Sequence, residues 1–183
     1  MTHKGDYQEP EFRKLRADEM RVKLVDVDEN GATVLLYTTA DAVRAILNEA
    51  LGPFGWTCEH YEVGKAVYCR LGLLSPDGEF VYKDAAGTAE SGIETDKTAD
   101  SDSFKRAARC WGVCEELLSF PKLRLGKDKI VLSSAQDARG RTYYTTGERF
   151  TVSEVAYDGA EIVALTLENQ SGKKIVWQRK NGN

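Results

Sequence analysis

Short alternating segments separated by turn-forming pairs constrain this chain more than any other feature of its sequence. Such pairs occur at Asn30-Gly31, Gly64-Lys65, Asp77-Gly78, Asp158-Gly159 and Ser171-Gly172, and they are typical of hairpins and tight turns. The alternation of apolar and polar residues around them predicts strands over residues 21–27, 32–37, 56–63, 66–74, 79–85, 129–133, 142–145, 150–157, 161–168 and 173–179. We therefore expect strands that are neighbours in the sequence to form most of the fold.

Two segments interrupt this pattern with helical spacing. Thr38 and Thr39 offer an N-cap for a helix that runs through Leu51, and Gly52-Pro53 ends it. A longer helix is expected from Thr98 to Leu118, before Pro121. The order of elements predicts an α+β fold, with a β-β-β-α core, a preceding hairpin and helix, and a small all-β C-terminal module.

These elements divide the chain into three parts. Residues 1–20 are polar and are expected to be a flexible N-terminal segment, residues 21–126 the core domain, and residues 127–183 the C-terminal β module. Of 183 residues, 42% are hydrophobic and 30% charged, which is typical of a globular protein. No stretch approaches the roughly 20 apolar residues that span a bilayer, and residues 1–11 lack the apolar region of a secretory signal.

Four cysteines without C-x-x-C spacing fit a reducing compartment better than a disulfide framework. Cys110 and Cys114 are one helical turn apart and are interpreted as core thiols. Cys58 and Cys69 lie on neighbouring predicted strands, where only one hairpin register brings them together. We expect no metal site and no cofactor.

The longer helix has two distinct faces. An apolar stripe recurs at steps of three and four residues at Phe104, Ala107, Ala108, Trp111, Cys114 and Leu118. Lys105, Arg106 and Arg109 fall on the opposite face, where fixed cations match the repeating phosphates of a nucleic acid strand. The alternative is a solvated helix face on which Asp102 pairs with Arg106, four residues further along.

Two blocks of sequence resemble the Rad-fifty-two / Rad-twenty-two family of single-strand annealing proteins, with its phage and prophage relatives. Residues 85–113 read AAGTAESGIETDKTADSDSFKRAARCWGV and match the family pattern D-x-x-K-R-A-x-R-x-[FW]-G from Asp102 to Gly112. Residues 48–56 read NEALGPFGW and match N-E-x-[FL]-G-x-x-G-W. The resemblance covers about residues 22–118 and leaves the C-terminal module without a family.

The resemblance implies subunits in a ring or filament that bind single-stranded DNA in a basic groove. Such proteins anneal complementary strands without ATP, in homologous recombination and double-strand break repair, and they are not enzymes. By position, Lys105, Arg106 and Arg109 match the basic residues of the groove, with Lys97 as a further basic position. The family has an arginine where this chain has Ala42, and Arg44 is the nearest replacement.

The expected partners are single-stranded DNA, further copies of the chain and a single-strand binding protein, in the cytoplasm of a bacterial host or of a phage-infected cell. No membrane partner is expected. One alternative is an accessory protein that protects single strands without annealing them. A metal-dependent nuclease is another, because residues 77–102 are rich in acids and begin after Pro76. Its D…[DE]-x-K pattern fails, however, because Val81 precedes Lys83 and Thr95 precedes Lys97 where an acid is needed.

Overall fold

The computed structural model describes residues 9–88 and 95–179, without the side chains of residues 95–98. The fold is α+β, as the sequence predicts. Packing divides the chain into two compact units. The first unit contains Met1–Lys14 and Thr39–Glu115, and the second contains Leu15–Thr38 and Glu116–Asn183.

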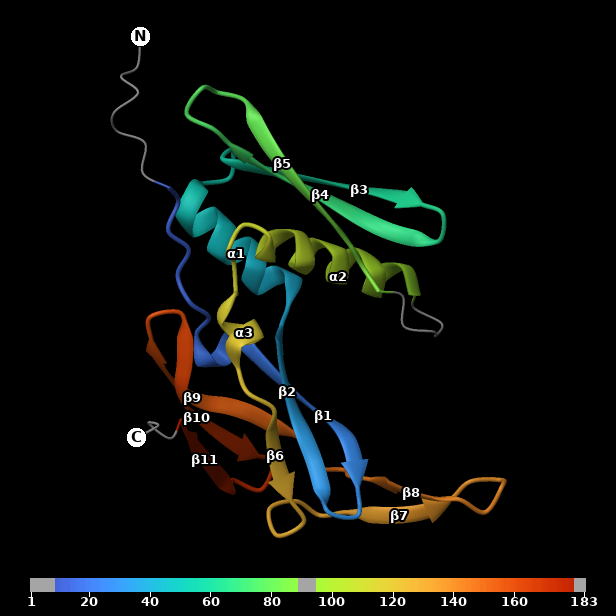
Figure 1. Cartoon of the computed structure of the whole chain (residues 1–183). Coiled ribbons are helices and arrows are strands. Elements are labelled where there is room, and N and C mark those ends of the chain that lie inside the picture. Colours follow the sequence, from blue (N-terminus) through green and yellow to red (C-terminus); the bar gives the residue numbers. More distant parts are fainter. Residues whose placement is uncertain (1–8, 89–94, 180–183) are drawn as a thin grey trace. The chain divides into compact units, whose positions relative to one another are not determined.

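The first unit is the expected β-β-β-α core with its preceding helix (Figure 1). Its elements are α1 (Ala40–Leu51), β3 (Trp56–Val63), β4 (Ala66–Leu74), β5 (Phe80–Ala86) and α2 (Thr95–Arg109). The strands form an antiparallel sheet in the order β3-β4-β5. Helix α2 packs against β4 and β5, and α1 packs against α2 and β3. Cys69, Leu71 and Leu73 alternate along β4 and are all buried, so they form the sheet's part of the core of this unit.

Helix α1 begins and ends where its sequence predicts. The Thr39 side chain accepts a hydrogen bond from the Ala42 N–H at 3.2 Å, which satisfies one of the free donors of the first turn. At the other end, Gly52 has a positive φ of 70°, and its N–H bonds to the Asn48 carbonyl at 2.9 Å. Ala42, Val43, Ile46 and Leu47 form the buried face of the helix.

Helix α2 is shorter at its C-terminal end than the sequence pattern predicts. It ends at Arg109 rather than Leu118, because Gly112 adopts a φ of 86° and turns the chain out of the helix. The Ala108 carbonyl then accepts the Val113 N–H at 3.2 Å, as in a Schellman cap. Leu118 consequently leaves the apolar stripe and is 67% exposed.

The second unit consists mostly of strands in three small sheets (Figure 1). Their orders are β1-β2-β6, β11-β10-β9 and β7-β8. The strands are β1 (Met20–Asp28), β2 (Gly31–Thr38), β6 (Leu123–Gly126), β7 (Ser133–Gln136), β8 (Thr142–Thr145), β9 (Phe150–Asp158), β10 (Glu161–Asn169) and β11 (Lys174–Gln178). Short helices η1 (Ala17–Glu19) and α3 (Glu116–Ser119) complete the unit. Strand β1 also packs against β9 and β8, whereas the residues of β7 and β8 are mostly exposed and add little to the core.

The units differ from the sequence-based boundaries at 20/21 and 126/127. The β1–β2 hairpin groups with the C-terminal strands because β2 pairs with β6, with Ala32 opposite Leu125. Leu15, expected in a flexible segment, is only 1% exposed, and its N–H donates to Glu116 at 2.8 Å. The prediction of a strand at residues 129–133 is wrong. Residues 127–130 form a turn and bend, and strand β7 begins at Ser133.

Candidate functional site

Helix α2 carries the cations that the sequence singles out, and its packing sets their direction. Phe104, Ala107 and Ala108 are almost fully buried on one side of the helix. Arg106 is exposed on the other side, while Lys105 and Arg109 are partly exposed. We call Lys105, Arg106 and Arg109 the cationic face of α2. Because the apolar side is packed against the sheet, the backbone that carries these cations is held in place.

Arg106 is already engaged within the protein. Its guanidinium forms an ion pair with Asp102 at 2.8 Å, one helical turn away. Asp102 also accepts the N–H and the hydroxyl of Thr88, both at 2.9 Å, and so ties the chain after β5 to α2. Burial raises the pKa of Asp102, but the hydrogen bonds from Thr88 and Arg106 outweigh this effect, and the net pKa is lowered. The ion pair expected for a solvated helix face is therefore present, although it involves only Arg106.

Lys105 and Arg109 differ from Arg106 in their surroundings. In the part of the chain that the structure describes, neither forms an ion pair with a carboxylate. Burial lowers the pKa of Lys105, and the positive charges of Arg109 and Arg106 lower it further, against the opposing effect of Asp102. Neighbouring cations that repel one another favour an anion that can contact several of them at once.

Arg44 lies on α1, where α1 packs against α2. Its guanidinium carbon is 5.0 Å from the centre of the Phe104 ring, and it forms an ion pair with Asp41 at 3.0 Å. Arg44 also acts electrostatically on the thiols of Cys58 and Cys69. The structure thus brings Arg44 to the helix pair, where it contacts Phe104 and Asp41. Lys97 lies in the first turn of α2, and its side chain is outside the described part of the structure.

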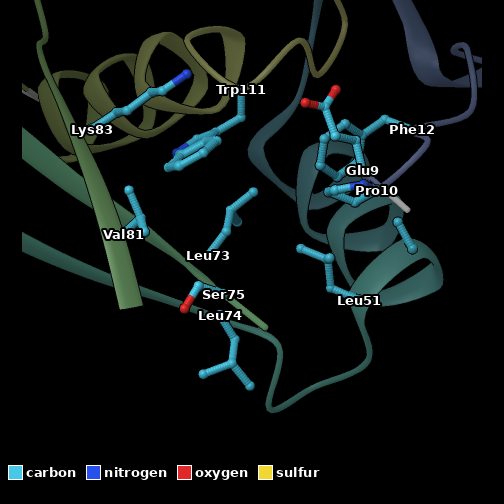
Figure 2. A pocket seen from close by; sticks show the side chains of 11 residues that line it. Glu9, Pro10, Phe12, Leu51, Leu73, Leu74, Ser75, Val81, Lys83 and Trp111 are labelled. Carbon is cyan, nitrogen blue, oxygen red and sulfur yellow. The ribbon is translucent and has the colours of Figure 1, made fainter. Parts of the chain in front are cut away.

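Lys83 is a further cation of this region, which sequence reasoning considered only as the lysine of a nuclease pattern. Its amine lies 4.2 Å from the centre of the Trp111 ring (Figure 2) and donates to the Cys110 carbonyl at 2.6 Å, at the C-terminal end of α2. The Trp111 indole donates to the Leu71 carbonyl at 3.2 Å. Alternation along β5 places Lys83 on the helix-covered side with Val81, and this signal was available in the sequence.

Lys83 and Trp111 line a pocket of about 460 Å³ within the first unit (Figure 2). Its lining is mostly apolar and includes Leu51, Leu73 and Val81. The Trp111 ring has Lys83 over it and a fixed indole hydrogen bond, so it serves the packing of the unit, which agrees with its place in the apolar stripe.

The described residues contain no group of three or more His, Cys, Asp or Glu side chains that could hold a metal ion. Glu90 and Glu94, which the nuclease alternative invokes, lie outside those residues. No helix in the described part of the chain is long and apolar enough to cross a membrane. Comparison of the chain with protein-family models, with curated proteins and with solved structures finds no match.

Proposed function

We propose that this chain binds single-stranded DNA and anneals complementary strands without ATP, as a protein of the Rad-fifty-two / Rad-twenty-two type. The cationic face of α2 is the observation that carries the proposal, because it presents three cations on a helix whose other side is buried. Lys and Arg held in this way contact phosphates and leave the bases free to pair. Such contacts carry no sequence information, which suits a protein that must accept any strand.

The proposal extends to the setting of this activity. The chain acts in homologous recombination and double-strand break repair, without bond-breaking catalysis and without a cofactor. It works as a ring or filament of identical subunits, because many weak contacts along one strand add up when subunits are linked. A single-strand binding protein is a further partner, and the setting is the cytoplasm of a bacterial host or of a phage-infected cell.

A binding titration tests the role of the cationic face. The triple variant Lys105→Ala, Arg106→Ala, Arg109→Ala is compared with wild type by fluorescence anisotropy of a labelled oligothymidylate. We expect an affinity loss of about tenfold or more, and a salt slope that is smaller by about 2, since each phosphate contact on a single strand contributes about 0.7.

The matched control removes the same charge from exposed sites elsewhere, with Lys65→Ala, Lys122→Ala and Lys127→Ala. This control should retain most of the affinity. Equal affinity of the wild type and a folded α2 triple variant would refute the proposal.

Annealing is distinguished from protection by a strand-pairing assay with bare complementary oligonucleotides. An annealing protein accelerates pairing, whereas a protein that only covers single strands slows it. Light scattering with and without oligonucleotide measures the assembly in the same samples. A strict monomer under both conditions would contradict the ring or filament.

A further inference from the structure

The sheet of the first unit has two different sides. Cys69, Leu71 and Leu73 of β4 are buried on the side where α2 packs. Strand alternation places Tyr68 and Arg70 of β4 on the other side, together with the residues opposite them on β3 and β5. Arg70 is exposed there and Tyr68 is partly exposed, so this second side is accessible to solvent.

Four aromatic rings and one guanidinium form a continuous row across this second side. We call the row the aromatic face, and its members in spatial order are Tyr68, Tyr61, Arg70, Tyr82 and Phe80. The rings of Tyr68 and Tyr61 are stacked, with their centres 5.5 Å apart. The guanidinium carbon of Arg70 lies 5.4 Å from the centre of the Tyr61 ring and 6.0 Å from that of Tyr82. The Phe80 ring follows at 6.2 Å from Tyr82, so the aromatic face spans all three strands.

The Tyr82 ring rests on the backbone of the neighbouring strand. Gly72 lies opposite Tyr82, and a Cβ added there would lie 2.6 Å from Cε1 and 2.8 Å from Cδ1 of the ring. The ring therefore occupies the space that a side chain at position 72 would fill. Tyr82 is nevertheless 50% exposed, so one side of its ring packs on the sheet and the other faces solvent.

The aromatic face has one more carboxylate than it has cations. Asp84 lies opposite Arg70 on β5 and accepts two hydrogen bonds from its guanidinium, at 3.1 and 3.3 Å. Glu59 lies opposite Arg70 on β3 and is exposed. It forms no ion pair with any residue that the structure describes. Glu59 and the Tyr82 ring thus both lie beside Arg70, and this carboxylate has no cation of its own.

We propose that the aromatic face binds an arginine-bearing segment of a partner protein. Arg70 shows the arrangement within the chain itself, because its guanidinium lies beside two tyrosine rings and pairs with a carboxylate. A partner guanidinium repeats this arrangement on the solvent side of Tyr82, with Glu59 as its carboxylate. A planar guanidinium can stack on a flat, open ring surface, which a compact ammonium group cannot do.

The charge of the aromatic face favours this occupant over a nucleic acid strand. Exposed tyrosine rings alone would suit nucleobases as well as guanidinium groups. Phosphates, however, would meet an excess of carboxylate here, whereas an arginine-bearing segment is complementary to it. Arginine is also one of the residues that contribute most to protein–protein interfaces.

A peptide titration of the full chain tests the proposal. The probe is a fluorescein-labelled peptide of alternating glycine and arginine, and the matched probe has lysine in place of every arginine. Fluorescence anisotropy at physiological salt measures both affinities. We expect the arginine peptide to bind at least about threefold more tightly, since the two probes differ in stacking and not in charge.

Variants locate the binding on the sheet. Tyr82→Ala and Glu59→Gln should each weaken the arginine peptide by about threefold or more. The matched controls are Tyr143→Ala, at a tyrosine of the second unit that is 48% exposed, and Glu62→Gln, at an exposed glutamate of β3 on the other side of the sheet. Both controls should bind as wild type. Tyr82→Phe keeps the ring and should also retain the affinity, which separates loss of the ring from loss of the fold.

Three results would overturn the proposal. The first is equal affinity for the two peptides, or unchanged affinity of a folded Tyr82→Ala chain. The second is an assembly of identical chains that light scattering shows to dissociate in Tyr82→Ala without peptide, because a second copy then occupies the face. The third is a loss of oligothymidylate affinity in Tyr82→Ala with unchanged peptide affinity. All these variants retain Lys105, Arg106 and Arg109, so failure here leaves the proposed function of the cationic face untouched.

Discussion

Asp102 joins two segments of the first unit through a single carboxylate. It accepts two hydrogen bonds from Thr88 and one from Arg106, so it fixes both the end of β5 and one member of the cationic face. A phosphate that binds Arg106 competes with the Asp102 carboxylate for the guanidinium. Among the described residues, Lys105 and Arg109 have no such ion pair to a carboxylate. Asp102 is also a position of the motif on which the family resemblance rests.

The depressed pKa of Asp102 makes part of the stability depend on pH. The folded pKa lies below the ordinary value of 3.8, so the ionised form stabilises the fold at neutral pH, and this contribution is lost as the pH falls through the folded pKa. Asp102→Asn should lower the free energy of unfolding by about 1 kcal/mol at pH 7.

Urea unfolding at pH 7 and at pH 3 measures this contribution. The gap between wild type and Asp102→Asn should narrow at the lower pH, because the unfolded chain then takes up a proton at Asp102 that the folded carboxylate resists. A gap of equal size at both values would show that the charge of Asp102 does not stabilise the fold.

Periodicity predicted the cationic face and its pair Asp102–Arg106, but not the contacts of the neighbouring cations Arg44 and Lys83. The spacing of Phe104, Ala107 and Ala108 placed them on one side, and all three are buried. The position of Arg44 over the Phe104 ring and the placement of Lys83 over Trp111 depend on how α1, α2 and β5 pack. Helical spacing carries no information about which element lies beside a given side chain.

At the scale of elements, Gly112 decides where α2 ends. The apolar stripe continues beyond it in the sequence to Cys114 and Leu118, and this continuation produced the longer prediction. Many helices tolerate a glycine within their pattern. Whether such a glycine ends the helix depends on whether the residues after it pack against another part of the fold. Here the helix stops, Val113 and Cys114 are both buried, and only Leu118 of the continued stripe is exposed.

Gly112→Ala should destabilise the protein by about 1 kcal/mol, because a side chain is strained at a φ of 86°. Gly147→Ala is the matched control, since Gly147 lacks a positive φ and its added Cβ meets nothing within 4 Å. Thermal or urea unfolding of both variants measures the difference. Equal stability of the two variants would mean that the positive φ at Gly112 carries no strain.

The register of the β3–β4 hairpin could have been predicted by counting residues outward from its turn. The two-residue turn Gly64-Lys65 joins Val63 to Ala66, and stepping outward from this pair leads to the register in which Cys58 and Cys69 are diagonal neighbours. Local turn chemistry thus contains the information that brings the two thiols together. The charge of Arg44, which comes from α1, reaches both thiols only through tertiary packing.

At the scale of the whole molecule, the chain passes between its two units several times. The first unit is interrupted between Lys14 and Thr39, and the second between Thr38 and Glu116. The β1–β2 hairpin therefore belongs with strands that lie some 90 residues further along the sequence. No local pattern marks this grouping, which explains why a linear division at residue 126 was the natural expectation.

A truncated chain distinguishes the division into two interleaved units from the sequence-based division at residue 126. Ending the chain at Gly126 removes β9 and β10, and β9 packs against β1. Hydrogen exchange should then show the amides of β1 and β2 at least about tenfold less protected, while those of β4 serve as an internal reference. Unchanged protection of β1 and β2 would support a self-sufficient domain over residues 21–126.

Turns, strand alternation and the two-faced helix were visible in the residues alone, because each depends on neighbours within a few positions of the chain. Only the tertiary structure decided the pairing of β2 with β6 and the residue at which α2 ends. It also decided which side chains Arg44 and Lys83 contact. Apart from the end of α2, these features join segments far apart in the sequence. Their contacts form only when burial of apolar surface and satisfied backbone hydrogen bonds across the whole fold outweigh the entropy of closing long loops.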